Sequence, residues 1–160
     1  MPVTAAIALG SNIGDRQAHI SYAFKALETL QRSILLACGP VIQTLPVAHP
    51  SVDPGGLYLN SAALLETDLS PRELLDGLHA IEQARGRNRA GEARWSARTL
   101  DLDLLTYGDR VIDQPGLIVP HSRMASRRFV LEPLHAIAPD LLVPGLGRVH
   151  ELLERLGSSQ

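Results

Sequence analysis

The sequence contains few residues of the kinds that mark disulfide-rich, membrane or secreted proteins. Cysteine occurs once, as Cys38, so no intrachain disulfide can form and a reducing, cytoplasmic location is expected. Its apolar neighbours predict a buried, inert thiol. No apolar run approaches the roughly 20 residues that a membrane-spanning helix needs. The N-terminus lacks a basic region followed by a long apolar segment, so we expect no signal peptide.

Net charge and length further limit the possible binding partners and the number of domains. The net charge of −2 gives no general attraction to nucleic acid or to anionic membranes, so neither is expected as a partner. With 160 residues and a hydrophobic fraction of 45%, the chain can fill one core, which predicts a single domain over residues 1–160. Charge is nevertheless uneven, because five arginines gather within a short stretch: Arg85, Arg87, Arg89, Arg94 and Arg98.

The most informative stretch is residues 94–105, RWSARTLDLDLL. Its leucines and aspartates alternate, so in a strand Asp101 and Asp103 lie on one face and the leucines on the other. Two like charges on one strand face repel each other unless a cation lies between them. Paired carboxylates suit Mg²⁺, which fills its shell with phosphate oxygens and water, and guanidinium groups recognise phosphate. Spacing alone leaves a solvated edge strand as good an explanation as a metal site.

This run resembles the signature of the 6-hydroxymethyl-7,8-dihydropterin pyrophosphokinase family, a group of folate-pathway enzymes. The shared pattern is basic, any, small, small, Arg, two of any kind, Asp, aliphatic, Asp and two aliphatics. Residues 9–16, LGSNIGDR, resemble the family's N-terminal motif, and residues 119–121 resemble its Val-Pro-His. The resemblance therefore covers most of the chain.

The resemblance implies transfer of pyrophosphate from ATP to the hydroxymethyl-dihydropterin, giving AMP and the pterin diphosphate. Two Mg²⁺ ions held by Asp101 and Asp103 would assist, with ATP as co-substrate, and Asp103 is a possible proton acceptor. Four residues are then expected to be catalytic: Asp101, Asp103, Arg87 and Arg98. The expected ATP-binding residues are Glu82, Arg87, Arg89, Trp95, Arg98, Leu104, His121 and Arg127. The expected pterin-binding residues are Thr44, Leu45, Val47, Tyr58, Asn60, Trp95, Asp101 and Phe129.

Several of these residues have simpler explanations when taken alone. An Asn on a strand is more often a surface residue, a lone His is more often structural, and Phe129 could equally belong to the core. Only the resemblance favours pterin contact for Asn60, whose amide suits the edge of a pterin ring, and phosphate contact for His121. Ser122 and Arg128 depart from the family pattern, which commonly has Tyr and Gly there.

The pattern of elements predicts an α+β fold with a ferredoxin-like βαββαβ order and helices packed on an antiparallel sheet. Strands are expected at residues 3–10, 34–44 (irregular at Cys38-Gly39-Pro40) and 58–66, with a fourth at the Asp-x-Asp run. Asp15 should cap a helix to about residue 31, with Ala18, Tyr22, Ala26 and Leu30 along its apolar side. Ser70, Pro71 and Glu73 form a strong start for a second helix to about residue 84. Residues 132–144 read as a proline-punctuated wrap that covers a sheet edge or builds the site, and residues 149–156 as a final helix.

Two other functions remain open at this point. The same strand order occurs in RNA-recognition domains, but those present exposed aromatics, and aromatic residues make up only 4% here. A non-catalytic assembly domain would leave the Asp pair and the arginines unexplained. The enzyme interpretation predicts Mg²⁺-dependent ATP binding, small-molecule substrates only, and a chain that acts as a monomer.

Overall fold

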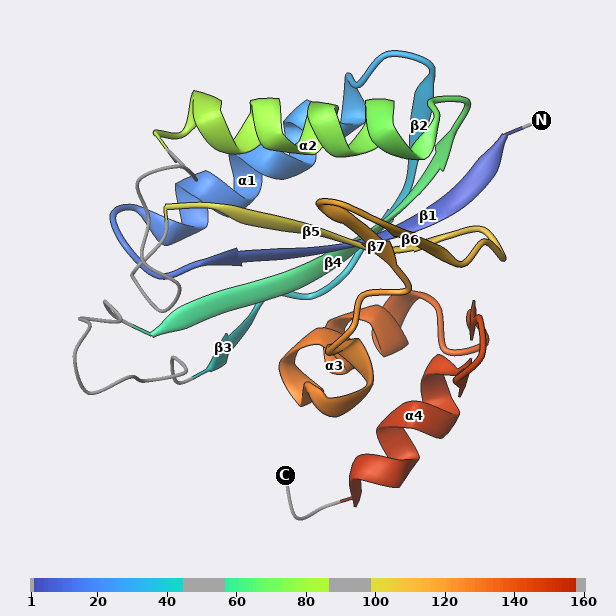
Figure 1. The fold of residues 1–160 in the computed structure, drawn as a ribbon. Helices are drawn as coiled ribbons and strands as arrows, with labels where there is room; N and C mark the ends of the chain where they lie inside the picture. The colour runs from blue at the N-terminus through green and yellow to red at the C-terminus, as the bar shows by residue number, and fades with distance from the viewer. Residues whose placement is uncertain (1, 45–56, 87–98, 158–160) are drawn as a thin grey trace.

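The computed structural model describes residues 2–44, 57–86 and 99–157. Its centre is an antiparallel sheet in the order β2-β4-β1-β5 (Figure 1). The strands are β1 (Val3–Ser11), β2 (Ser33–Cys38), β4 (Tyr58–Thr67) and β5 (Asp101–Tyr107), and β3 (Ile42–Thr44) pairs with β4. Strands lie where the sequence predicted them, except that the second predicted strand is divided into two, and the sheet is antiparallel as expected.

The predicted second strand is interrupted, forming β2 and β3 in place of one element. Gly39 stands at the break, and its backbone N–H donates to the Ala62 carbonyl at 2.7 Å. A Cβ atom at this position would lie 2.9 Å from the Pro133 carbonyl oxygen, so only glycine fits without displacement. Cys38 is exposed, which corrects the expected burial. The pKa of Cys38 is nevertheless raised, mainly because its thiol is partly buried and to a smaller extent because the Glu28 carboxylate is near. A raised pKa disfavours the reactive thiolate.

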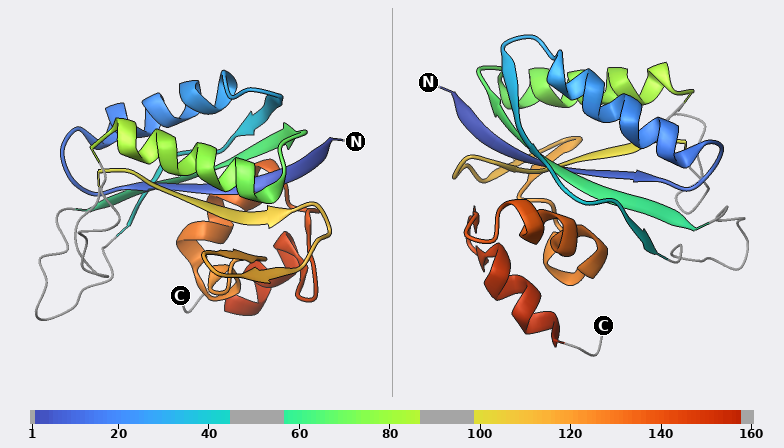
Figure 2. Two further views of the ribbon diagram at one scale, coloured as in Figure 1. Left: turned by 45° about the horizontal axis from the view of Figure 1, so that its top comes forward. Right: turned by 180° about the vertical axis from the view of Figure 1, so that it is seen from behind.

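Helices α1 (Arg16–Glu28) and α2 (Pro71–Ala84) cover one face of the sheet (Figure 2). Both predicted starts are confirmed. The Asp15 side chain accepts from the Ala18 N–H, and Ser70 and Glu73 form a reciprocal capping box. Helix α1 ends three residues before the predicted end.

The apolar stripe predicted for α1 was wrong in part. The residues it buries are Ile20, Ala23 and Leu27, whereas Tyr22 is exposed. Ala26 and Leu30 do pack against the core, so the predicted spacing was correct for these two residues and wrong for Tyr22. The core on this face includes Ile7, Leu9, Leu65, Leu74, Leu78 and Leu102.

The C-terminal part of the chain covers the other face of the sheet, where only an edge covering or a site-building role was predicted. Helices α3 (Arg128–Ile137) and α4 (Val149–Leu156) pack there, with the 3₁₀ turn η2 (Met124–Ser126) (Figure 2). The second core includes Ala6, Ala8, Ala62, Leu105, Met124, Leu131, Leu134 and Leu152. The proline-punctuated wrap was wrong where α3 forms: Pro133 lies inside this helix and is buried, so packing outweighs the local cost of proline. The final helix is confirmed.

Short elements complete the described chain. Strands β6 (Ile112–Gln114) and β7 (Leu117–Val119) form a hairpin, as do β8 (Leu142–Val143) and β9 (Gly147–Arg148). None of the helices in the described ranges is both long enough and apolar enough to cross a membrane.

Candidate active site

The centre of the candidate site is a row of residues that crosses the sheet. Gly10 on β1 lies opposite Asn60 on β4 and opposite Asp101 on β5. Residues directly opposite each other in antiparallel strands project to the same face. Asn60 and Asp101 therefore share one face of the sheet, with the chain's first strand between them.

Gly10, the last residue of the predicted first strand, lies at the centre of this row although it was not among the predicted site residues. A Cβ atom there would lie 3.3 Å from Asn60 Oδ1 and 3.6 Å from the Tyr58 ring. Because Gly10 has no side chain, Asn60 and Tyr58 can pack closely against the backbone of β1 at this point. The glycine that ends an apolar strand was visible in the sequence, but its neighbours depend on strand register.

The polar side chains on β3 and β4 are held in place. Asn60 is 6% exposed, and its Nδ2 donates to Thr44 Oγ1 at 2.6 Å. Thr44 in turn lies opposite Tyr58, whose side chain is half-buried. The hydrogen bond fixes the amide orientation, so that the Asn60 Oδ1 acceptor side is also defined. The structure thus brings together Thr44, Tyr58 and Asn60 as the resemblance implied.

The alternation predicted for the Asp-x-Asp strand is confirmed. Asp101 and Asp103 are half-buried, whereas Leu100, Leu102 and Leu104 are buried at 5% exposure or less. Asp103 lies opposite Ala8 on β1, two residues from Gly10. The two carboxylates therefore follow one another along the same face as Asn60.

Glu82 anchors the strand that carries these carboxylates. This residue of α2 is 1% exposed, and its Oε2 accepts a 2.7 Å hydrogen bond from the Leu102 backbone N–H. Among the described residues, β5 is the last strand of the sheet, so a side chain satisfies a backbone donor on the side away from β1. The structure places Glu82 in the interior, where it fixes the backbone between Asp101 and Asp103; its contact with ATP stays a prediction.

His121 comes from the segment after β7 and is fixed to β5 by its own backbone, whose N–H donates to the Leu105 carbonyl at 2.8 Å. Its Nδ1 accepts from the Arg123 backbone N–H at 3.2 Å, so the neutral ring carries its proton on Nε2. Burial, and then the nearby Arg127 guanidinium, lower the pKa of His121, while Asp101 raises it. The ring therefore offers an Nε2–H donor rather than a permanent positive charge.

Arg127 and Phe129 enter the same region from the start of α3. The Arg127 guanidinium carbon lies 5.6 Å from the centre of the Phe129 ring, and Phe129 is half-buried against the second core. Burial and then Arg123 lower the pKa of Arg127, whereas Asp103, Asp101 and Tyr58 raise it. The Arg127 guanidinium is therefore within electrostatic range of the carboxylate pair and of Tyr58.

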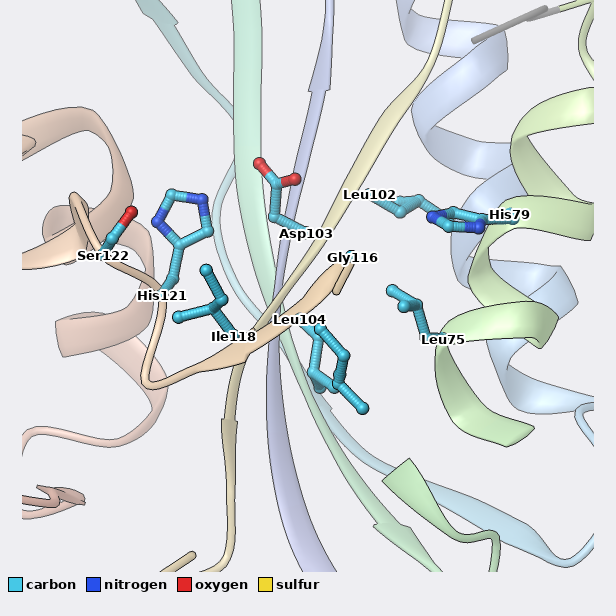
Figure 3. Close-up of a pocket in the computed structure, with 10 residues that line it drawn as sticks. Leu75, His79, Leu102, Asp103, Leu104, Gly116, Ile118, His121 and Ser122 are labelled. Carbon is cyan, nitrogen blue, oxygen red and sulfur yellow. The ribbon is translucent and has the colours of Figure 1, made fainter. Parts of the chain in front are cut away.

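A pocket of about 220 Å³ opens beside Asp103 (Figure 3). Helix α2 contributes Leu75 and His79, and the β7 region contributes Ile118 and His121 from the opposite side. Ligand sites more often measure roughly 300–1,000 Å³, so this one suits one ring system of a larger ligand. Leu104, an expected ATP-binding residue, lines it together with Asp103.

The structure shows the surroundings of Ser122 and Arg128, the two residues that depart from the family pattern. Ser122 lines the pocket next to His121. Arg128 donates to the Gly157 carbonyl at 2.7 Å and pairs with Glu132 at 2.6 Å. Arg128 therefore ties the start of α3 to the end of α4, a structural role.

The remaining predicted site residues lie outside the described part of the chain: Leu45, Val47, Arg87, Arg89, Trp95 and Arg98. Among the described residues, no group of three or more His, Cys, Asp or Glu side chains could hold a metal ion by itself. Asp101 and Asp103 still fit Mg²⁺, which typically takes one or two carboxylates and completes its shell with phosphate oxygens and water.

Comparison with known proteins gives one consistent family. The family model described as 7,8-dihydro-6-hydroxymethylpterin-pyrophosphokinase (HPPK) matches residues 6–139. A 2-amino-4-hydroxy-6-hydroxymethyldihydropteridine pyrophosphokinase from Pseudomonas aeruginosa is 43% identical over 147 residues, covering 92% of this chain and 88% of the relative. The protein of the same name from Haemophilus influenzae is 40% identical over 153 residues, covering 96% and 92%.

Solved structures agree at the level of the fold. The Plasmodium falciparum HPPK-DHPS structure with pteroate has a TM-score of 0.74 at 12% identity, and another HPPK-DHPS structure in complex with substrates has 0.70 at 11%. The alignments cover 97% of this chain but only 42% and 43% of those longer chains. With the family model matched over most of its length and relatives near 40% identity, this chain belongs to the HPPK family.

Proposed function

We propose that this chain transfers pyrophosphate from ATP to 6-hydroxymethyl-7,8-dihydropterin, giving AMP and the pterin diphosphate in folate biosynthesis. The observation that carries the proposal is the row across the sheet, in which Gly10 places Asn60 and Asp101 on one face. The row puts an amide suited to a heterocycle next to carboxylates suited to a phosphate-bound cation. Membership of the family supplies the reaction.

The pterin binds on β4 and its neighbours. Asn60 presents its amide to the pyrimidine edge of the ring, with the orientation fixed by Thr44. Tyr58 and Phe129 contact the ring faces, and Asp101 lies at the side where the hydroxymethyl group reacts. Leu45, Val47 and Trp95 complete this subsite in the proposal.

The nucleotide binds across the pocket beside β5. Its base enters the cavity between α2 and the β7 region, in contact with Leu104, and the volume of about 220 Å³ suits one ring system. The phosphates then extend past His121 toward Asp103, which lines the same cavity. The Nε2–H of His121 donates to a phosphate oxygen, a role that does not require a protonated ring. The proposed nucleotide site also includes Glu82, Arg87, Arg89, Trp95, Arg98 and Arg127.

Phosphoryl transfer needs alignment and charge neutralisation more than covalent chemistry by the protein. Asp101 and Asp103 hold Mg²⁺, as two ions in this proposal, and when bound the metal neutralises phosphate charge and orients the phosphates. Arg127 adds fixed positive charge, and Arg87 and Arg98 stabilise charge on the transferring group. The substrate hydroxyl attacks the β-phosphorus and AMP leaves.

The hydroxyl proton goes to Asp103 in this account. An Asp103→Asn enzyme that keeps near-normal turnover would rule that assignment out.

The fold is the ferredoxin-like βαββαβ arrangement, which the strand order β2-β4-β1-β5 supports. The chain acts as a monomer, since one chain supplies every residue invoked, and ATP as co-substrate favours the cytoplasm.

A binding experiment separates this proposal from a nucleic-acid-binding or assembly domain. Calorimetric titration with a non-hydrolysable ATP analogue should show binding that requires Mg²⁺ and that weakens at least tenfold in Asp101→Asn. Titration with the pterin should weaken in Asn60→Ala, while Arg155→Gln on α4 serves as a control for both. Nucleotide binding that is indifferent to Mg²⁺ and to Asp101 would contradict the proposal.

A further inference from the structure

Arg85 makes a cluster of contacts that the proposed mechanism does not use. It caps the C-terminus of α2, and its Nε donates to His19 Nδ1 at 2.9 Å in a partly buried hydrogen bond. Its guanidinium carbon lies 4.7 Å from the centre of the Tyr22 ring. His19 and Tyr22 are three residues apart on α1 and therefore lie side by side on the helix surface. One arginine thus engages both a ring nitrogen and an aromatic face.

These contacts join two helix ends beside the candidate site. Helix α1 begins after β1, the strand that carries Gly10, and α2 ends at Ala84, two residues after Glu82. Figure 1 shows the start of α1 and the end of α2 on the same side of the molecule as the start of β5. Glu82 then bonds the backbone between the two carboxylates at 2.7 Å. A continuous chain of contacts therefore runs from α1 through Arg85 and Glu82 to β5.

We propose that Arg85, His19 and Tyr22 form a clamp that positions the end of α2 and, through Glu82, the strand segment carrying Asp101 and Asp103. These three are positioning residues, because they contact neither substrate nor metal in the proposed site. The catalytic part of the inference rests on the proposed function. The contact itself does not, and it can be tested separately.

The clamp also depends on the protonation state of His19. His19 Nδ1 can accept from Arg85 only while it is unprotonated, which requires the neutral ring with its proton on Nε2. The charged groups that act on the ring are Arg85 from α2 and Asp15 from the turn before α1. Burial and then Arg85 lower the pKa of His19, and Asp15 raises it. The clamp is therefore closed at neutral pH and is released as acid protonates His19.

Imidazole NMR on the intact protein tests the contact directly. We expect His19 to be in the Nε2–H form at pH 7.5, and its pKa to rise in Arg85→Gln because the neighbouring cation is removed. The Arg155→Gln control loses a comparable hydrogen bond, to the Leu146 carbonyl at 3.0 Å on α4, and should leave His19 unchanged. An Nδ1–H tautomer, or a pKa that does not move in Arg85→Gln, would overturn the clamp.

Steady-state kinetics test the positioning role. His19→Ala and Arg85→Gln should each lower kcat roughly 2- to 30-fold, the range that couplings through a packed network reach, with KM changed less than twofold. The double variant should be no slower than the slower single variant, because both remove one contact. His19→Asn, whose Oδ1 can accept in place of Nδ1, should recover most of kcat and lose the part of the acid limb that titrates with His19.

Each outcome has one meaning. A confirmed NMR signature with unchanged kcat in both single variants overturns the positioning role and leaves the proposed function intact. A wild-type protein that makes no AMP overturns the proposed function and the catalytic part of this inference together. The NMR result then shows whether the contact exists.

Discussion

Replacing Glu82 tests how α2 holds the carboxylate strand. Glu82→Ala removes the acceptor of the Leu102 N–H, at a position where the glutamate is 1% exposed and the hydrogen bond is 2.7 Å. A buried donor left without a partner costs about 1–3 kcal/mol of unfolding free energy. For a chain of this size that corresponds to a melting temperature lower by roughly 2–12 °C.

The matched variant is Glu82→Gln. Its side-chain carbonyl can accept from the same N–H, and it removes a buried carboxylate whose desolvation is unfavourable. We therefore expect its unfolding free energy to stay within about 1 kcal/mol of the wild type. AMP production should fall more in the alanine variant than in the glutamine variant, because only alanine frees the backbone between Asp101 and Asp103.

Urea denaturation followed by circular dichroism gives the unfolding free energies, with a steady-state assay run on the same preparations. Equal stability of Glu82→Ala and the wild type would refute the anchoring role. A glutamine variant as unstable as the alanine variant would show that the charge, rather than the hydrogen-bond acceptor, stabilises this position.

Four further predictions follow from the site. Asp101→Asn and Asp103→Asn should each lower kcat by roughly 10²-fold or more with the circular dichroism spectrum unchanged, since charge stabilisation of this kind has that size. Asn60→Ala should raise the pterin KM about 10- to 100-fold with a smaller change in the ATP KM, as measured by varying each substrate. Arg128→Ala should lower the unfolding free energy by about 1 kcal/mol in urea and leave kcat unchanged, because its contacts are partly exposed. Stability should fall as pH drops below 6.5, the ordinary pKa of histidine, because burial holds the folded-state pKa of His121 lower; His121→Asn should reduce this dependence.

The parts of the fold that the sequence predicted depend on local chemistry. The alternation around Asp101 and Asp103 needs only the two-residue period of a strand, and the box of Ser70 and Glu73 needs only helix-end hydrogen bonds. The strand break at Gly39 was also visible as an irregularity. Its cause was not, because the Pro133 carbonyl that excludes a side chain lies far away in the sequence.

The parts that the sequence did not predict depend on tertiary contacts. Gly10 joins Asn60 to Asp101 only through the register of three strands, which no local pattern encodes. The contact of Arg85 with His19 needs two helix ends to meet. Pro133 predicted an irregular segment where α3 forms, because burial of the helix outweighs the local free-energy cost of a proline inside it.

The most direct test of the central claim is the fate of ATP, followed by ³¹P NMR with purified protein, Mg²⁺ and 6-hydroxymethyl-7,8-dihydropterin. We predict that AMP and the pterin diphosphate form in equal amounts, that both require the metal and the pterin, and that both are lost in Asp101→Asn. ADP with a pterin monophosphate would keep the nucleotide site and contradict pyrophosphoryl transfer. Unchanged ATP in the presence of folded protein and both ligands would contradict the enzyme assignment as a whole.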